Sequence, residues 1–204
     1  MTPSPESLDV SRETFEKLAL YATLLEKWNP RINLVARSTL DDLWTRHIVD
    51  SLQLLRLADG AMPHWADLGS GGGFPGLVIA IAAQETANPA RVTMVESDQR
   101  KATFLRTVLR ETEVAGQVIA ERIEKVPPLG ADILSARALA DLSALLGFAE
   151  RHLAPGGLCL FPKGKNWKSE LQSAQQAWHF SYQAIPSQTE SQSVVLKIEG
   201  LSRV

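Results

Sequence analysis

The residues best suited to chemistry lie in one ten-residue stretch, 67–76, which reads Asp-Leu-Gly-Ser-Gly-Gly-Gly-Phe-Pro-Gly. Glycines allow positive φ and let a ligand approach the backbone closely, because they have no Cβ. An apolar pair, Trp65 and Ala66, precedes this stretch, and an apolar run, 77–83, follows it. The pattern predicts a strand, a glycine turn and a buried helix. Such an arrangement typically binds a nucleotide-like ligand at the N–H groups of the helix start.

Two overlapping glycine patterns in this stretch favour different ligands. The pattern Asp-x-Gly-x-Gly-x-Gly starts at Asp67 and includes Gly69 and Gly71. An acidic residue at the strand end suits S-adenosylmethionine (AdoMet). The segment 71–76 also fits Gly-x-Gly-x-x-Gly, which is found in NAD sites. No Gly-Lys-Ser/Thr follows, so a P-loop is excluded.

Candidate ligand-binding residues follow the next two predicted strands. Glu96 ends the second strand, and it follows Gly76 by about 20 residues, the spacing at which a carboxylate accepts the hydroxyls of a ribose. Ile123 and Glu124 follow the third strand. There, a backbone N–H and a carboxylate would either meet an adenine edge or form a surface pair. The sequence alone leaves these two interpretations open.

Arg137 follows the fourth predicted strand, 131–135. The carboxyl ends of strands surround the ligand crevice of a doubly wound sheet, so this arginine is a candidate functional residue. The Asn/Asp-Pro-Pro-aromatic motif of amino-group methyltransferases is absent at this point. Carbon-5 pyrimidine methyltransferases need a cysteine nucleophile. The single Cys159 lies inside a predicted strand and is expected to be buried and structural.

Basic residues around an aromatic side chain indicate a surface for RNA. Lys163, Lys165 and Lys168 flank Trp167 after the fifth predicted strand, and the predicted helix 99–111 carries four more basic residues. Such groups hold phosphates and stack on bases. We expect both groups to lie on one rim of the sheet and to contact an RNA backbone.

The histidines give no sign of a metal site. His47 and Asp50 lie three positions apart on a predicted helix. We interpret them as a core histidine hydrogen-bonded to its neighbour. The other three histidines are isolated in the sequence, and one cysteine cannot form a zinc site.

The elements that must position these residues alternate along the chain. Before position 61 the sequence predicts two helices, one from Glu13 to a stop at Asn29-Pro30 and one over 40–55. After position 61, strands and helices alternate, which predicts a parallel sheet with right-handed crossovers. The last two strands, 180–185 and 193–198, have no helix between them, so one of them is expected to run antiparallel. A sharp turn is expected at 155–157, before the fifth strand.

The composition is that of a globular protein. Of the 204 residues, 45% are hydrophobic and 22% are charged, and the net charge is −2. The chain is therefore no polycation, and nucleic-acid binding requires a local patch. No apolar run reaches the ~18 residues of a membrane helix, and the N-terminus does not read as a signal peptide. We expect a cytoplasmic protein.

Five blocks of this sequence, in order, resemble the RsmG (GidB) family, and the resemblance spans roughly residues 15–200. The blocks are Trp28-Asn29-x-x-Ile32-Asn33-Leu34, Arg46-His47-x-x-Asp50-Ser51-Leu52, the stretch 67–76, Ser135-Ala136-Arg137-Ala138 and Lys163-Gly164. The resemblance implies a class I, Rossmann-like AdoMet-dependent methyltransferase fold of the α/β class. The expected sheet has seven mainly parallel strands with an antiparallel last strand. Residues 1–60 are expected to form a helical extension packed on a methyltransferase domain, 61–204, in a single domain overall.

The resemblance also implies a reaction, a cofactor and partners. The implied reaction is methylation of guanine N7 in 16S ribosomal RNA, with AdoMet as cofactor and with the RNA or an assembling small ribosomal subunit as partner. It places Gly69, Phe74, Ile123, Glu124 and Arg137 against AdoMet. No metal, no membrane and no oligomer is required.

This reaction agrees with the absence of acid–base motifs. Guanine N7 carries a lone pair and no proton, so it attacks the sulfonium methyl group directly, and no general base is needed. Positioning then carries the catalysis. We assign Arg137 and Lys163 to such positioning roles, at guanine O6 or a phosphate.

Three other functions remain open at this stage. An NAD-dependent oxidoreductase is compatible with the glycine turn and Glu96. A non-catalytic RNA-binding factor would keep the same fold. A ribose 2′-O-methyltransferase would use a lysine, for which Lys163 is the candidate, although the usual Asp partner is absent after the fourth strand.

Overall fold

The computed structural model describes residues 3–58, 60 and 62–204. Three α-helices and two irregular turns precede the first strand. In chain order they are α1 (Pro5–Leu8), α2 (Arg12–Ile32), a 3-10 turn (Arg37–Thr39), a π-helical turn (Trp44–Val49) and α3 (Asp50–Arg56). The alternating part of the chain consists of β1 (His64–Leu68), α4 (Gly76–Ala82), β2 (Arg91–Val95), α5 (Gln99–Glu111), β3 (Gln117–Ile119), a 3-10 turn (Ile123–Lys125), β4 (Ala131–Ala136), α6 (Leu142–His152), β5 (Leu153–Lys163), α7 (Trp167–Ala174), β6 (Trp178–Pro186) and β7 (Val194–Arg203).

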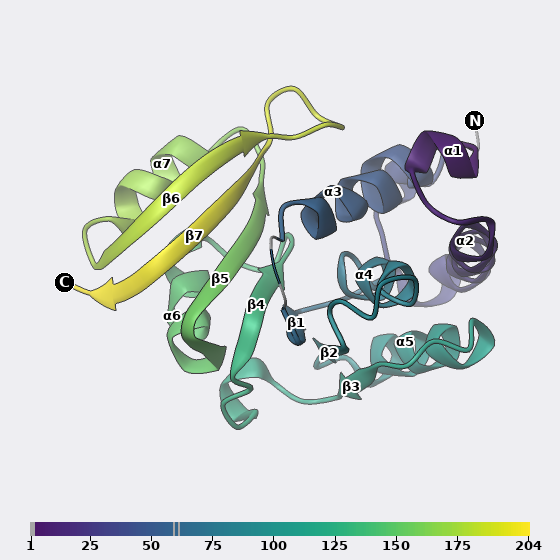
Figure 1. Cartoon of the computed structure of the whole chain (residues 1–204), viewed down its shortest axis with the longest axis horizontal. Coiled ribbons are helices and arrows are strands. Elements are labelled where there is room, and N and C mark those ends of the chain that lie inside the picture. The colour runs from purple at the N-terminus through teal and green to yellow at the C-terminus, as the bar shows by residue number, and fades with distance from the viewer. Residues whose placement is uncertain (1–2, 59, 61) are drawn as a thin grey trace.

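The seven strands form one sheet in the order β3-β2-β1-β4-β5-β7-β6 (Figure 1). Strands β1 to β5 run parallel to one another, whereas β7 pairs antiparallel with both β5 and β6. The predicted α/β class, the seven-stranded sheet and the antiparallel last strand are therefore confirmed.

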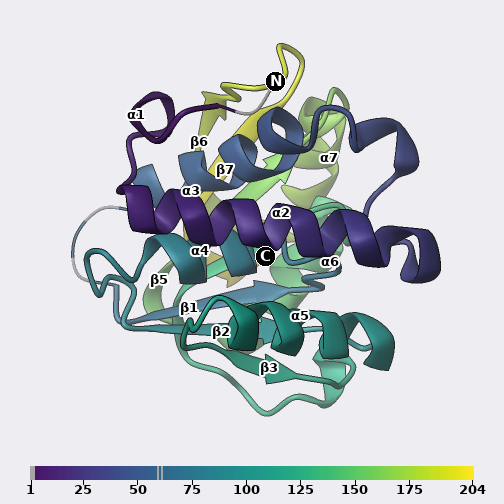
Figure 2. The same cartoon turned by 90° about the vertical axis from the view of Figure 1, so that its right-hand side faces the viewer.

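Helices cover both faces of this sheet (Figure 1). On one face, α2, α3, α4 and α5 pack around a core that includes Tyr21, Trp65 and Phe104. On the other face, α6 and α7 pack around Leu146, Cys159 and other buried residues. Figure 2 shows α2 crossing in front of α4 on the first face, where the two helices are in contact. The N-terminal helices thus cover apolar sheet surface that would otherwise meet water.

Three local predictions differ from the structure. Helix α2 continues through Pro30 to Ile32 instead of stopping before the proline. Proline removes only its own N–H from the ladder, and the Asn29 side chain accepts the N–H groups of Leu34 and Val35 just beyond the helix, which stabilises this end. The predicted helix 40–55 is interrupted by the π-helical turn.

The predicted turn at 155–157 also differs, because it lies within strand β5. Ala131 pairs with Leu153, and the register then shifts so that Ile133 pairs with Leu158. Gly156 has a φ of +75° at this bulge. A glycine bulge therefore bends the strand where the sequence indicated a loop.

The strand register brings the candidate residues together. Leu68 of β1 pairs with Val95 of β2 and with Ala136 of β4. The residues that follow these three, Gly69, Glu96 and Arg137, therefore begin side by side at the carboxyl edge of the sheet. No helix among the described residues is long and apolar enough to cross a bilayer.

Candidate functional site

A cavity of about 980 Å³ lies at the carboxyl edge of the sheet. Its size is at the upper end of the range of small-molecule sites. The glycine turn and Glu96 form one side, and Pro162, Lys163 and Gly164 form another. Residues of the N-terminal segment and of the β6–β7 loop complete the wall. The cavity therefore has room for a cofactor and part of a second molecule.

The glycine turn wraps around the end of β1. Gly69 and Gly71 have φ values of +66° and +54°. A Cβ on Gly69 would lie 2.6 Å from Leu139 Cδ1. The N–H groups of Gly69 and Ser70 both donate to the Val95 carbonyl, at 2.8 and 3.1 Å. The turn is thus a rigid backbone surface that needs glycine for its conformation and for close approach.

Asp67 supports this turn from inside the protein. Its side chain accepts hydrogen bonds from the Gly76 N–H at 3.2 Å and from the Ser135 hydroxyl at 2.8 Å. Asp67 has no exposed surface and is not among the residues that line the cavity. The predicted contact of Asp67 with the cofactor is therefore corrected to a structural role. The Gly76 N–H, which we expected to face the ligand at the helix start, instead donates to the Asp67 carboxylate.

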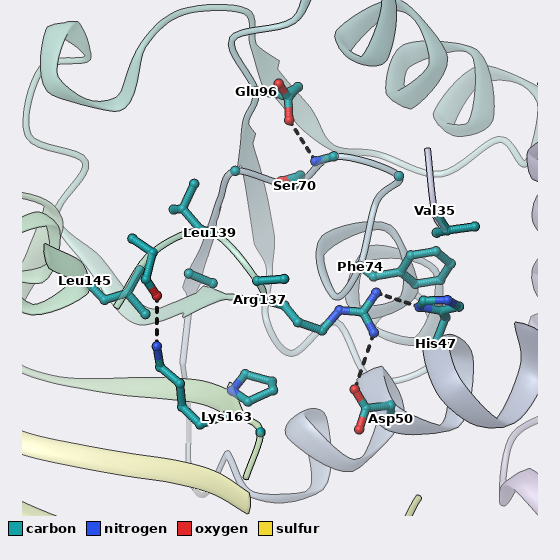
Figure 3. Close-up of a pocket in the computed structure, with 18 of the residues that line it drawn as sticks. Val35, His47, Asp50, Ser70, Phe74, Glu96, Arg137, Leu139, Leu145 and Lys163 are labelled. Atoms are coloured by element: carbon teal, nitrogen blue, oxygen red, sulfur yellow. Dashed lines mark hydrogen bonds and ion pairs between the residues drawn. The ribbon is translucent and has the colours of Figure 1, made fainter. Parts of the chain in front are cut away.

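Glu96 lies on the cavity wall and also braces the turn (Figure 3). Its two carboxylate oxygens accept the N–H groups of Gly71 and Asp98, both at 2.8 Å. Each carboxylate oxygen has a second lone pair, so these bonds leave acceptor sites for ribose hydroxyls. The ribose contact of Glu96 remains a prediction.

Ile123 and Glu124 also line the cavity, in the 3-10 turn after β3. The Ile123 carbonyl accepts a hydrogen bond from buried His152 Nε2 at 3.1 Å, which fixes the turn to the end of α6. The chain therefore brings both residues to the same cavity as the glycine turn. Their contact with an adenine ring stays a prediction.

Arg137 extends from the end of β4 into the cavity (Figure 3). Its guanidinium lies over the ring of Phe74, with the carbon 5.0 Å from the ring centroid. Nη1 donates to the Arg46 carbonyl at 3.1 Å and to Asp50 Oδ2 at 3.4 Å, and Nη2 donates to His47 Nδ1 at 2.8 Å. Phe74, which the resemblance placed against the cofactor, thus also supports Arg137.

His47 differs from its predicted role. It is hydrogen-bonded, but its partners are Arg137 and, at 2.8 Å, Thr39 Oγ1, and not its neighbour Asp50. Its ring stacks on Phe74 at 4.8 Å between centroids and lines the cavity. Burial, followed by the charges of Arg137 and Arg46, lowers the pKa of His47 to about 3, so the imidazole is neutral near pH 7.

Lys163 lines the cavity, but its ammonium is held in place by neighbours. It donates to Glu170 Oε2 at 2.7 Å and to the Ala140 carbonyl at 2.9 Å. The same Glu170 oxygen accepts the Leu142 N–H. Lys163 and Glu170 therefore fix the loop between Arg137 and α6. A contact of Lys163 with guanine O6 or a phosphate stays a prediction.

The predicted RNA-binding rim is wrong in one respect. Helices α5 and α7 cover opposite faces of the sheet (Figure 1), so the basic residues on their outer sides lie apart. Lys101 and Lys163, one from each predicted group, nevertheless line the same cavity. Arg106 donates to the Val118 carbonyl, and Arg110 pairs with Glu111 at 2.8 Å. Periodicity predicted the exposed side of α5 but could not show which sheet face the helix covers.

Several residues that support the cavity leave no pattern in the sequence. The hydroxyl of Tyr21 in α2 donates to the Gly72 carbonyl at 2.6 Å, which ties the N-terminal segment to the glycine turn. In the β6–β7 loop, Thr189 donates to Asp50 Oδ1 at 3.0 Å, and Glu190 pairs with Arg46 at 3.3 Å. Partners so far apart in sequence leave no local pattern.

The remaining reactive groups indicate neither a nucleophile nor a metal site. Cys159 is fully buried, as predicted, and burial raises the pKa of its thiol to about 12. Across residues 3–58, 60 and 62–204, no group of three or more histidine, cysteine or acidic side chains has the arrangement of a metal site.

The chain has close relatives among methyltransferases. The family model described as rRNA small subunit methyltransferase G (GidB) matches residues 14–195. The ribosomal RNA small subunit methyltransferase G of Ruegeria pomeroyi is 60% identical over 204 residues, which cover 100% of both chains.

Solved structures share the fold at low identity. MtNAS in complex with S-adenosylmethionine is 15% identical, with a TM-score of 0.60 over 90% of this chain and 74% of that one. A putative S-adenosyl-L-methionine-dependent methyltransferase from Methanococcus maripaludis is 13% identical, with a TM-score of 0.58 over 87% and 91%. Both likenesses show the class I methyltransferase fold.

The residues present fit the cofactor that such enzymes use. A glycine backbone surface, an acidic side chain after β2 and a large cavity at the carboxyl edge suit AdoMet. With the family match over most of the chain, this site leads to one conclusion: the chain belongs to the rRNA small subunit methyltransferase G (GidB) family of AdoMet-dependent methyltransferases.

Proposed function

We propose that this protein transfers the methyl group of AdoMet to N7 of a guanine in 16S ribosomal RNA. The observation that carries the proposal is that the glycine turn lines the same cavity as residues of β5, the residues after β4 and the N-terminal segment. The chain is also a member of the methyltransferase G family. Action on ribosomal RNA also agrees with the cytoplasmic location and the small-subunit partner expected from the sequence.

The glycine turn and Glu96 are proposed to hold the methyl donor, together with Ile123 and Glu124. AdoMet supplies an electrophilic methyl group on a sulfonium sulfur. Guanine N7 donates its lone pair to the methyl carbon while the carbon–sulfur bond breaks and its electrons remain on sulfur. Positive charge moves from sulfur to the guanine ring and no proton is released, so the side chains need only align the reactants and exclude water.

Arg137 is the candidate for holding the acceptor or the donor by hydrogen bonds. An arginine has five N–H donors, and among the described residues only Nη1 and Nη2 of Arg137 form hydrogen bonds, three in all. The remaining donors suit guanine O6, a phosphate or a carboxylate. Lys163 holds the loop that follows this arginine, because its ammonium donates to Ala140 and Glu170. An ammonium engaged in this way suits a positioning role better than the activation of a ribose hydroxyl.

The experiment compares modified guanosines in 16S RNA from a strain that lacks this protein and from the same strain with the gene restored. Mass mapping is expected to show one N7-methylguanosine that depends on the protein. Purified protein with labelled AdoMet and unmodified small-subunit RNA is expected to restore the same modification. A ribose methyl group at the mapped site, or AdoMet binding without any transfer to RNA, would contradict the proposal.

The NAD alternative is tested with the same purified protein. Calorimetry is expected to show binding of AdoMet and none of NAD. The family match already favours this result, because the matched relatives are named methyltransferases.

A further inference from the structure

The position of His47 suggests a role that the proposed chemistry does not use. It lies in the π-helical turn before α3, it is 9% exposed, and it contacts the cavity rather than only the core. Its two ring nitrogens have partners on opposite sides of the ring, Arg137 and Thr39 (Figure 3 shows the first). A histidine that served only to fill the core would need no partner in the cavity.

The hydrogen bonds fix the tautomer of His47. A guanidinium only donates, so Nδ1 of His47 must accept from Arg137 and therefore carries no proton. Nε2 then carries the ring hydrogen and donates to Thr39 Oγ1 at 2.8 Å. The Thr39 hydroxyl in turn donates to the Ala36 carbonyl at 2.7 Å. A chain of hydrogen bonds thus runs from the backbone at Ala36 to the guanidinium in the cavity.

Arg137 is held on three sides by this arrangement. Phe74 lies against the face of the guanidinium, His47 accepts from Nη2, and Asp50 accepts from Nη1. Asp50 is itself held by Gln53, whose Nε2 donates to Oδ1 at 2.7 Å. These two side-chain acceptors and the Arg46 carbonyl, which also accepts from Nη1, all come from the N-terminal segment, whereas Arg137 directly follows β4.

Fixing Arg137 in advance has a direct benefit for binding. A free arginine side chain has about 2 kcal/mol of rotamer entropy, part of which is lost when a ligand orders it. An arginine that is already ordered binds its ligand without that loss.

We propose that His47 is a positioning residue whose neutral Nδ1 holds the Arg137 guanidinium in its binding orientation, so that the N-terminal segment completes the active site. This inference rests on the proposed function only where its test measures methyl transfer to RNA.

The test compares two amides at position 47 in the full chain. In Asn, Oδ1 is attached to Cγ as Nδ1 is in histidine, so His47→Asn keeps the acceptor for Arg137. In Gln, the amide lies one bond further out, near the position of Nε2, so His47→Gln keeps only the bond toward Thr39. Thr39→Val is the matched control, because it removes the other partner of His47.

We expect His47→Asn to keep kcat/KM for small-subunit RNA within about threefold and His47→Gln to lower it by roughly 100-fold, the effect of a small misplacement in an active site. AdoMet affinity, measured by calorimetry, should fall less in His47→Asn than in His47→Gln. Thr39→Val is expected to have an effect between those of the two variants. Equal losses in His47→Asn and His47→Gln would overturn the proposal.

A double-mutant cycle separates positioning from a general loss of structure. His47→Gln is expected to cost little when Arg137→Ala is already present, because its effect passes through Arg137. Multiplicative losses of AdoMet affinity in the double variant would overturn the proposal even if every variant folds. The same cycle is measured on kcat/KM for small-subunit RNA, which reports Arg137 where it contacts the guanine. The affinity cycle needs no RNA, so it can be measured even if the protein methylates no ribosomal RNA and the proposed function fails.

Discussion

Asp67 is fully buried, and its carboxylate is surrounded by groups that can only donate hydrogen bonds to it. Trp65 Nε1 donates to Ser135 Oγ at 2.8 Å, so the Ser135 hydroxyl hydrogen is directed to Asp67 Oδ1. The Gly76 N–H can only donate as well, and it reaches Oδ2. An acceptor-only carboxylate therefore fits this position better than an amide, at the expense of burying a charge.

This arrangement predicts a pH effect on stability. Burial raises the pKa of Asp67 from 3.8 to about 6, and the neighbouring donors Ser70, Ser135 and Gly76 oppose that rise only in part. Between pH 4 and 6 the unfolded chain has released a proton that the folded protein still holds, so this group makes stability fall as the pH rises through that window. A shift of this size corresponds to on the order of 3 kcal/mol.

Urea unfolding of the wild type and of Asp67→Asn at a series of pH values between 4 and 7 measures the effect. The variant lacks the titrating group, so the free energy of unfolding of the wild type should fall relative to that of the variant as the pH rises from 4 to 6. Parallel curves for the two proteins would show that Asp67 does not titrate in this range.

His47 should have the opposite sign in the same experiment. Its pKa is lowered in the folded protein to about 3, so below pH 6.5 the unfolded chain takes up a proton that the folded protein does not. Its contribution is therefore present above pH 6.5 and lost as the pH falls toward 3. We expect His47→Asn to be less sensitive than the wild type to acid over this range, as measured by thermal unfolding. Equal acid sensitivity of the two proteins would contradict the lowered pKa.

At the scale of the element, the glycine turn depends on one residue of α2. Tyr21 is fully buried, and its hydroxyl satisfies the Gly72 carbonyl. Tyr21→Phe leaves that carbonyl without its partner, so we expect a loss of about 1–3 kcal/mol in stability and a weaker affinity for AdoMet. Tyr182→Phe is the control, because Tyr182 is 42% exposed and should change stability by less than about 0.5 kcal/mol. Equal effects of the two variants, measured by urea unfolding, would contradict this role.

Gly69 and Gly147 offer a second matched pair. Gly69 has a positive φ, and an added Cβ would meet Leu139, which also lines the cavity. We expect Gly69→Ala to lower stability by the ~1–2 kcal/mol cost of a left-handed residue. Because the added Cβ would also displace the turn and Leu139 at the cavity, we expect the affinity for AdoMet to fall by roughly tenfold, or about 1.4 kcal/mol. Calorimetry measures the change.

Gly147 is the control for this prediction. It lies within α6, and an added Cβ would meet nothing within 4 Å. Gly147→Ala should therefore raise stability by up to about 1 kcal/mol and leave the affinity unchanged. A Gly69→Ala variant that binds AdoMet as tightly as Gly147→Ala would contradict the role of the glycine turn.

Which features could be predicted from the sequence depends on how far apart in the chain the interacting residues lie. The glycine turn, Glu96 and the end of β4 were predictable, because alternation of strands and helices places strand ends at one edge. The partner of His47 was not predictable, because Arg137 lies 90 positions away in the sequence. The continuation of α2 through Pro30 was missed for a local reason: the side chain of Asn29 stabilises the turn after the helix, and the proline alone indicated a stop.

In the whole molecule, the β6–β7 loop and the N-terminal segment meet at the rim of the cavity. The β6–β7 loop contacts the N-terminal segment through Thr189 and Asp50, and the Gln188 N–H donates to the Gln53 side chain at 3.1 Å. Arg137 links both to the centre of the sheet. The first and last quarters of the sequence are therefore both required to build the site.

This closure predicts that residues 1–60 and 61–204 unfold together as a single domain. Helix α2 covers buried residues of α4 and α5, so its loss would expose apolar surface of the core. We expect hydrogen exchange of the amides in α2 (Arg12–Ile32) and in β5 (Leu153–Lys163) to report the same free energy of opening and the same dependence on urea. Amides of α2 that exchange at a clearly lower free energy would show an extension that opens by itself. In that case, addition of AdoMet should raise the free energy of opening of the α2 amides to that of the β5 amides, because we expect the AdoMet site to need Tyr21 and Arg137 together.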